Sequence, residues 1–183
     1  ACYGVDDQLA DRLAADFFDR VMDAFEGIPC WPSGKFLPSS IQFATYAAAG
    51  EDIPATPDGR SAGSPLADSL APVHGKDIAG ATAMLSSVAS LPLKRMVGTP
   101  VVNLRLQKQF LSGQLEGLVR GFFRKGGMQL QVSCYSREEL LNALEHPQRH
   151  QNLIVRVGGY AEYFNRLSPQ LQQAVLERTE HLQ

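Results

Sequence analysis

Apolar residues recur at helical spacing in the first part of the chain. The stripe consists of Leu9, Leu13, Phe17, Val21 and Phe25, and it is widened by Ala10, Ala14, Phe18 and Met22. Asp6 and Asp7 suit the first turn of a helix, and Gly27 provides a stop. The spacing predicts an amphipathic helix over residues 6–26, with this stripe facing the core.

Strand and helix patterns alternate from residue 101 onward. Apolar or alternating runs predict strands at 101–106, 128–133 and 153–157. Helical spacing predicts one helix from 110 to the glycines at 126–127, a second from Ser136 to Pro147 and a third from Ser168. This order indicates an α/β fold with parallel strands joined by crossovers.

The middle of the chain is less regular. Residues 82–91 are rich in alanine and leucine and predict a short helix, whereas 40–46 are expected to be extended. Trp31 is expected to pack in the interior, and Pro57-Asp58-Gly59 predicts a tight turn.

Length and charge restrict the class of protein. The chain has 183 residues and a net charge of -2, which fits one domain and argues against a charge-driven nucleic-acid or membrane partner. Its apolar runs are far shorter than the roughly 20 residues that span a bilayer, and no signal pattern is present, so we expect a cytoplasmic protein. It starts without methionine in a segment with structural patterning, which suggests a piece of a longer protein.

The metal-ligating residue types form no recognisable site. Cys2, Cys30 and Cys134 are odd in number and widely spaced, and we expect free thiols. His146 and His150 are four residues apart, but Pro147 interrupts the helix that would align them, so we expect no metal site. Gln129 and Gln131 share a strand face and either line a pocket or serve the fold.

A glycine pair stands out near the end of the chain. The β-branched run 154–157 predicts a buried strand, which Gly158-Gly159 then breaks. Tyr160, Tyr163 and Phe164 follow, and we expect them to shield the glycines within an interior. The alternative is a purely structural turn in a plain, non-catalytic α/β binding domain.

Several strings resemble glycyl radical enzymes, the family of pyruvate formate-lyase and the glycerol and diol dehydratases. They are Tyr3-Gly4-Val5-Asp6-Asp7, Pro57-Asp58-Gly59-Arg60, Pro65-Leu66-Ala67-Asp68, and Arg156-Val157-Gly158-Gly159-Tyr160-Ala161 followed by Phe164, Asn165, Leu167, Gln173 and Arg178. The resemblance covers nearly the whole chain. It implies the last part of a ten-stranded α/β barrel with the glycine loop in its centre. We therefore expect 57–183 to be the glycyl radical domain and 1–56 to be the end of the upstream barrel region.

The resemblance implies that Gly159, directly before the tyrosine, holds the radical. A radical at Cα requires a planar centre, which glycine reaches without steric cost because it has no Cβ. Val157, Gly158 and Tyr160 would support the loop. Arg156 would anchor it, although an arginine at the end of a strand can also simply reach solvent.

The resemblance also implies partners that this chain lacks. A catalytic cysteine on the upstream part of the enzyme would take the radical and pass it to a small-molecule substrate, as in a lyase, dehydratase or formate acetyltransferase. A separate activating enzyme with S-adenosylmethionine and an iron–sulfur cluster would install the radical, so that the chain binds no cofactor directly. The full enzyme would be compatible with a homodimer, and this chain alone would be inactive. A stand-alone subunit that replaces the radical domain of an oxygen-damaged enzyme is the alternative within the family.

Overall fold

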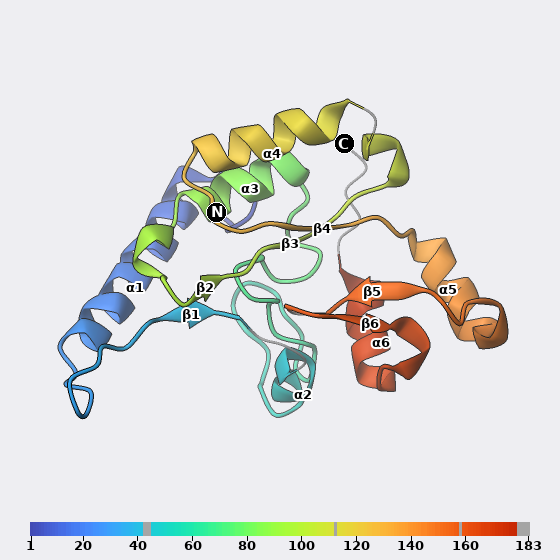
Figure 1. The fold of residues 1–183 in the computed structure, drawn as a ribbon, viewed down its shortest axis with the longest axis horizontal. Helices are drawn as coiled ribbons and strands as arrows, with labels where there is room; N and C mark the ends of the chain where they lie inside the picture. Colours follow the sequence, from blue (N-terminus) through green and yellow to red (C-terminus); the bar gives the residue numbers. More distant parts are fainter. Residues whose placement is uncertain (42–44, 112, 158, 179–183) are drawn as a thin grey trace.

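The computed structural model describes residues 1–41, 45–111, 113–157 and 159–178 (Figure 1). The helices are α1 Gln8–Glu26, α2 Thr45–Glu51, α3 Ala81–Ala89, α4 Gln114–Arg124, α5 Arg137–Glu145 and α6 Pro169–Glu177. The strands are β1 Ser39–Ser40, β2 Thr99–Pro100, β3 Asn103–Arg105, β4 Gln131–Ser133, β5 Ile154–Arg156 and β6 Ala161–Tyr163. Within these ranges, no helix combines the length and the apolar character that crossing a membrane requires.

The strands pair in three short sheets. β1 pairs with β2, and β3 with β4, both in parallel, whereas β5 and β6 are antiparallel. Helix α4 lies between β3 and β4 in the chain, so the predicted crossover between parallel strands is confirmed. The expected passage from β5 through a loop directly into a helix is wrong, because the chain turns back and forms β6 first. The α/β class is observed, while the ten-stranded barrel stays a prediction.

One hydrophobic core lies between α1, α3, α4 and the β3–β4 pair. In Figure 1, α3 and α4 run side by side above these two strands, with α1 along one flank. Fully or nearly fully buried residues of this core include Met22, Met84, Leu85, Val88, Leu104, Leu106 and Phe122. Burial of such side chains contributes about 1.5–3 kcal/mol each, so this core fixes the position of β3.

Only part of the predicted apolar stripe of α1 faces the core, where Met22 is buried and Phe18 and Val21 pack against it. Leu9, Leu13 and Phe17 are 61–64% exposed, whereas Asp11 and Met22 are buried. Ser87 of α3 donates a hydrogen bond to the Asp11 carboxylate (3.0 Å), which joins this side of the helix to α3. Helix α1 has apolar residues on two sides, and the side that carries Asp11 and Met22 is the one that faces the core.

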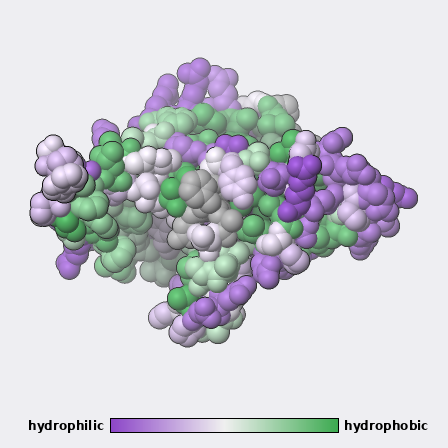
Figure 2. Space-filling view, turned by 60° about the horizontal axis from the view of Figure 1, so that its bottom comes forward, coloured by the Kyte–Doolittle hydropathy of each residue, from purple (hydrophilic) through white to green (hydrophobic). Residues whose placement is uncertain are grey.

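Exposed apolar residues also gather around the C-terminal end of α1. Figure 2 shows hydrophobic residues concentrated toward this end of the molecule, while the opposite end is largely hydrophilic. The exposed side chains at this end include Phe25, Ile28, Trp31, Phe36, Leu37 and Val97. Trp31 is 92% exposed, so its predicted packing in the interior is wrong.

A second core joins α5, α6 and the β5–β6 hairpin. Its buried residues include Leu140, Val155, Val157, Phe164, Val175 and Leu176. Helix α2 adds Tyr46 and Ala47, which pack with Ala174 of α6. This helix replaces the extended segment predicted up to residue 46, of which only β1 is a strand; residues 42–44 lie outside the described ranges.

Two predicted helix starts that frame the second core are confirmed. The Ser136 hydroxyl accepts a hydrogen bond from the Glu139 N–H at the start of α5. Ser168 caps α6 in the same way, with Pro169 in the first turn. Local sequence alone determines both caps, because side chains within four residues satisfy the unpaired N–H groups.

Candidate functional site

The glycine loop is the tip of the β5–β6 hairpin. Arg156 pairs with Ala161 in the last step of the ladder, and the Val157 N–H donates to the Tyr160 carbonyl (3.0 Å). Only Gly158 and Gly159 remain between these anchored residues, and Gly158 lies outside the described residues. Gly159 has φ +78°, a left-handed conformation that favours glycine.

The expectation that this chain itself shields Gly159 is wrong, because Gly159 is exposed. Phe164 is fully buried in the second core, and Tyr160 packs partly against the same core. The aromatic residues therefore fasten the hairpin to the core instead of covering its tip. A two-residue tip made of glycines has no side chains of its own with which to exclude water.

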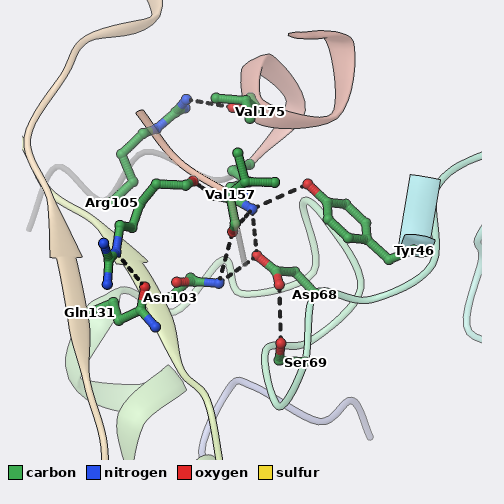
Figure 3. Close-up of polar contacts among 10 residues, drawn as sticks. Tyr46, Asp68, Ser69, Asn103, Arg105, Gln131, Val157 and Val175 are labelled. Atoms are coloured by element: carbon green, nitrogen blue, oxygen red, sulfur yellow. Dashed lines mark hydrogen bonds and ion pairs between the residues drawn. The ribbon is translucent and has the colours of Figure 1, made fainter. Parts of the chain in front are cut away.

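The base of the loop is held by Arg178, which follows α6. Its Nη1 donates to the Arg156 carbonyl (2.5 Å), and its Nη2 donates to the Val157 carbonyl (2.6 Å). Nη2 also forms an ion pair with the Asp68 carboxylate (2.7 Å) and donates to the Tyr46 hydroxyl (3.1 Å). In Figure 3, Tyr46, Asp68 and Val157 converge from three separate segments of the chain.

Asn103 of β3 completes this arrangement, which we call the loop clamp: Arg178, Asp68, Tyr46 and Asn103. The Asn103 Nδ2 donates both to Asp68 Oδ2 (2.8 Å) and to the Val157 carbonyl (3.3 Å). The Ser69 hydroxyl donates to the other oxygen of Asp68 (3.2 Å). Both oxygens of the buried carboxylate thus have partners, as a charge removed from water requires.

The loop clamp is almost completely buried. Arg178 is 8% exposed and Asp68 is 1% exposed. Burial by itself lowers the pKa of Arg178, but the Asp68 carboxylate and Tyr46 outweigh it, so that the pKa is raised and the guanidinium stays charged. Burial raises the pKa of Tyr46, which keeps its hydroxyl neutral and able to accept a hydrogen bond from Arg178.

Arg156, the residue predicted to anchor the loop, has a side-chain amide as the partner of its guanidinium. Its Nε donates to Gln131 Oε1 of β4 (2.7 Å), so the side chain ties the hairpin to the neighbouring strand. Its carbonyl is held by Arg178. Gln129 accepts from the Val102 N–H (2.8 Å), and both glutamines therefore make contacts that serve the fold.

A small polar cavity adjoins the loop clamp. It has a volume of about 30 Å³, and its lining includes Asp68, His74, Asn103, Tyr135 and Arg178. Burial, followed by the nearby positive charge of Arg178, lowers the pKa of His74. A cavity of this size has room for about two water molecules and is too small for an organic substrate.

The other candidate ligands stay apart. Cys2, Cys30 and Cys134 are free, half-buried thiols, as predicted. In the described ranges, no three histidine, cysteine or acidic side chains lie close enough together to hold a metal ion. His150 instead contacts the Asn142 side chain through Nε2 (2.6 Å).

Comparisons with known proteins cover nearly the whole chain. The chain is 36% identical over 189 residues to the PFL-like enzyme TdcE of Escherichia coli (strain K12), a match that covers 97% of this chain and 25% of that protein. A solved structure from work on 1,2-propanediol dehydration in Roseburia inulinivorans aligns with a TM-score of 0.94 at 33% identity, covering 98% of this chain and 23% of that one. The B12-independent glycerol dehydratase from Clostridium butyricum, in its glycerol-bound form, aligns with a TM-score of 0.94 at 31% identity, covering 99% and 24%.

The chain thus spans about a quarter of the length of the curated relatives it matches. A family model described as "Glycine radical" matches residues 66–165, which include the hairpin and Asp68. This match extends over more than half of the 183 residues, and the chain therefore belongs to the glycyl radical enzyme family.

Proposed function

We propose that Gly159 is the radical site of this chain. The observation that carries the proposal is the geometry of the hairpin tip. Gly159 is exposed and has no side chain, while the N–H and the carbonyl of Val157, directly before the tip, are both hydrogen-bonded. An external enzyme can reach the Cα of Gly159, and the hydrogen bonds at the base of the loop hold the loop in position. The family match at 66–165 includes this glycine.

The chemistry is the removal of one hydrogen atom. In the activating enzyme, one electron cleaves S-adenosylmethionine into methionine and a 5′-deoxyadenosyl radical, which takes a hydrogen atom from Gly159 Cα and becomes 5′-deoxyadenosine. The unpaired electron left on Cα is shared with the flanking amide nitrogen and carbonyl. Glycine allows the planar geometry that this sharing needs, because no Cβ clashes with the neighbouring peptides.

The chain acts in this proposal as the radical-storing part of a longer enzyme. Residues 57–183 form the radical domain, and residues 1–56 belong to the region before it. A cysteine outside the chain gives its S–H hydrogen to the Gly159 radical and becomes a thiyl radical, which then attacks a small substrate. The relatives are about four times as long as this chain, and the remainder of such a protein supplies the shield that Gly159 lacks here.

Reaction types follow the relatives and stay broad. Among them are a PFL-like enzyme, formate acetyltransferases and a trans-4-hydroxy-L-proline dehydratase. We propose a lyase, dehydratase or formate acetyltransferase-like reaction, with the substrate chosen by residues outside this chain. An exposed tip on an anchored base also fits a stand-alone replacement subunit, which would restore activity when added to an oxygen-damaged relative.

Electron paramagnetic resonance (EPR) spectroscopy tests the radical site. The chain is incubated under nitrogen with an activating enzyme, a reductant and S-adenosylmethionine. We expect a doublet signal from the wild type and no such signal from Gly159→Ala. Gly75→Ala is the matched control, because Gly75 is also exposed, has φ +75° and leaves open space for a Cβ. Absence of a doublet in the wild type, or its survival in Gly159→Ala, overturns the proposal.

A further inference from the structure

The position of the glycine loop depends on a residue far from it in sequence. The Val157 N–H and carbonyl are both bound, and the carbonyl of Arg156 is bound as well. The only donor that reaches both carbonyls is the guanidinium of Arg178, among the hydrogen bonds of the described residues. Asn103 reaches the Val157 carbonyl alone, so among the described residues Arg178 is the side chain that joins the two carbonyls at the base of the tip.

An arginine suits this task for geometric reasons. Nη1 and Nη2 are held rigidly in one plane and meet two successive carbonyls, those of Arg156 and Val157. A lysine carries a single point charge on a flexible stem and cannot bridge both acceptors in a fixed orientation. Hydrogen bonds from a charged donor in a buried site are also stronger than neutral ones, so they limit the movement of the carbonyls.

Two members of the loop clamp, Asp68 and Tyr46, hold Arg178 itself. Asp68 balances the buried charge, and Tyr46 accepts from the same Nη2. Asp68 lies in the segment before α3, whereas Tyr46 belongs to α2. With Asn103 of β3 and Arg178 itself, the loop clamp thus brings four separate parts of the chain to the base of the hairpin. Arg178 and Tyr46 lie outside the family match at 66–165.

We propose that Arg178, oriented by Asp68 and Tyr46, is the positioning residue of the glycine loop and sets how long a radical on Gly159 persists. This inference rests on the proposed function and deepens it. A base that is released lets the tip sample conformations in which solvent and quenching molecules reach Cα. Decay then rises in proportion to the population of released conformations.

A purely structural role for a buried arginine makes a different prediction, and the chain offers a matched control. Arg60 is 4% exposed and donates to the carbonyls of Ile53, Pro54 and Ser64. It therefore has the burial and the kind of acceptor that Arg178 has, but at a segment other than the hairpin. If Arg178 serves stability alone, Arg178→Lys and Arg60→Lys affect the hairpin alike.

The first test needs no radical. Amide hydrogen exchange at Val157, measured by NMR, reports opening of the loop base, because this N–H donates to the Tyr160 carbonyl. Each variant is measured at a temperature the same number of degrees below its own melting temperature. We expect exchange about 10- to 100-fold faster in Arg178→Lys, on the scale of one lost charged hydrogen bond, and unchanged in Arg60→Lys. Equal exchange in the two variants overturns the inference.

Tyr46→Phe keeps the inference testable if Arg178→Lys does not fold. It removes one acceptor of Arg178 and leaves the ion pair with Asp68 in place. We expect about threefold faster exchange at Val157, on the scale of one weak hydrogen bond. Exchange at the wild-type rate contradicts the role of the loop clamp.

The second test follows the radical. After activation, decay of the doublet under nitrogen should be about tenfold faster in Arg178→Lys and unchanged in Arg60→Lys. A wild-type chain that gives no doublet overturns the proposed function. A wild-type doublet that decays at the same rate in Arg178→Lys overturns the role of Arg178 and leaves the radical site standing. The two failures are therefore distinguishable.

Discussion

Gly50 in α2 offers a prediction whose sign the structure sets. A Cβ built on Gly50 would clash with the carbonyl oxygen of Ser64 and lie 2.9 Å from the Cα of Pro65. These are backbone atoms, which cannot move aside as a flexible side chain can. Next to this contact, the Tyr46 carbonyl of α2 accepts a hydrogen bond from the Leu66 N–H (3.0 Å), so the helix and this segment are joined. Gly50→Ala therefore separates α2 from the segment that leads to Asp68.

The size of the effect follows from two opposing contributions. Replacing a helical glycine with alanine ordinarily stabilises a protein by about 0.5–1 kcal/mol. Overpacking of a close contact costs about 1–3 kcal/mol. The net loss at Gly50 is about 1–2 kcal/mol, which corresponds to a fall in the melting temperature of about 2–8 °C for a chain of this size.

Gly117 in α4 is the matched control. A Cβ on Gly117 meets nothing within 4 Å, so alanine gains helix propensity without a clash. We expect Gly117→Ala to raise the melting temperature by about 1–4 °C, in contrast to the fall at Gly50. Thermal unfolding followed by circular dichroism measures both. A Gly50→Ala variant as stable as Gly117→Ala would refute the reasoning.

Three further predictions concern buried groups. Burial raises the pKa of Asp11, so the folded state holds its proton more tightly than the unfolded chain; Asp11→Asn should be more stable than the wild type at pH 7, and thermal unfolding should show this advantage shrinking as the pH falls toward about 4. Burial lowers the pKa of His74, so the wild type loses stability as the pH falls below about 6.5; the melting temperature of His74→Gln relative to the wild type should rise between pH 7.5 and 5.5, and a constant difference would contradict this sign. Phe164→Ala should cost about 3–5 kcal/mol in denaturant unfolding, because Phe164 is fully buried, whereas Phe123→Ala, at a residue 45% exposed, should cost far less.

Elements determined by local sequence could be predicted well. The starts of α5 and α6 follow from the N-cap residues Ser136 and Ser168. The β3–α4–β4 crossover follows from the change between strand and helix periodicity along the sequence. In each case the decisive contacts lie within a few residues or within one repeating pattern. The caps need no knowledge of the rest of the molecule.

Features set by distant contacts could not be predicted in the same way. Periodicity showed that α1 is amphipathic, but which part of its wide apolar stripe faces inward follows from contacts with distant residues, among them the contact of Asp11 with Ser87 of α3. The arginine that anchors the glycine loop was expected next to it in sequence, at Arg156. The guanidinium that binds the carbonyls at the base of the loop belongs to Arg178, which follows α6. The only signal for Arg178 was its place in the string that resembles the family.

The central claim is that the unpaired electron resides on Gly159, and EPR spectroscopy of isotopically labelled protein tests it most directly. A glycyl radical keeps one hydrogen on Cα, and that hydrogen splits the signal into a doublet. Chain produced with glycine deuterated at Cα and then activated under nitrogen should give a collapsed, unresolved line, while Gly159→Ala should give no glycyl signal. A splitting that glycine deuteration leaves unchanged would contradict the account.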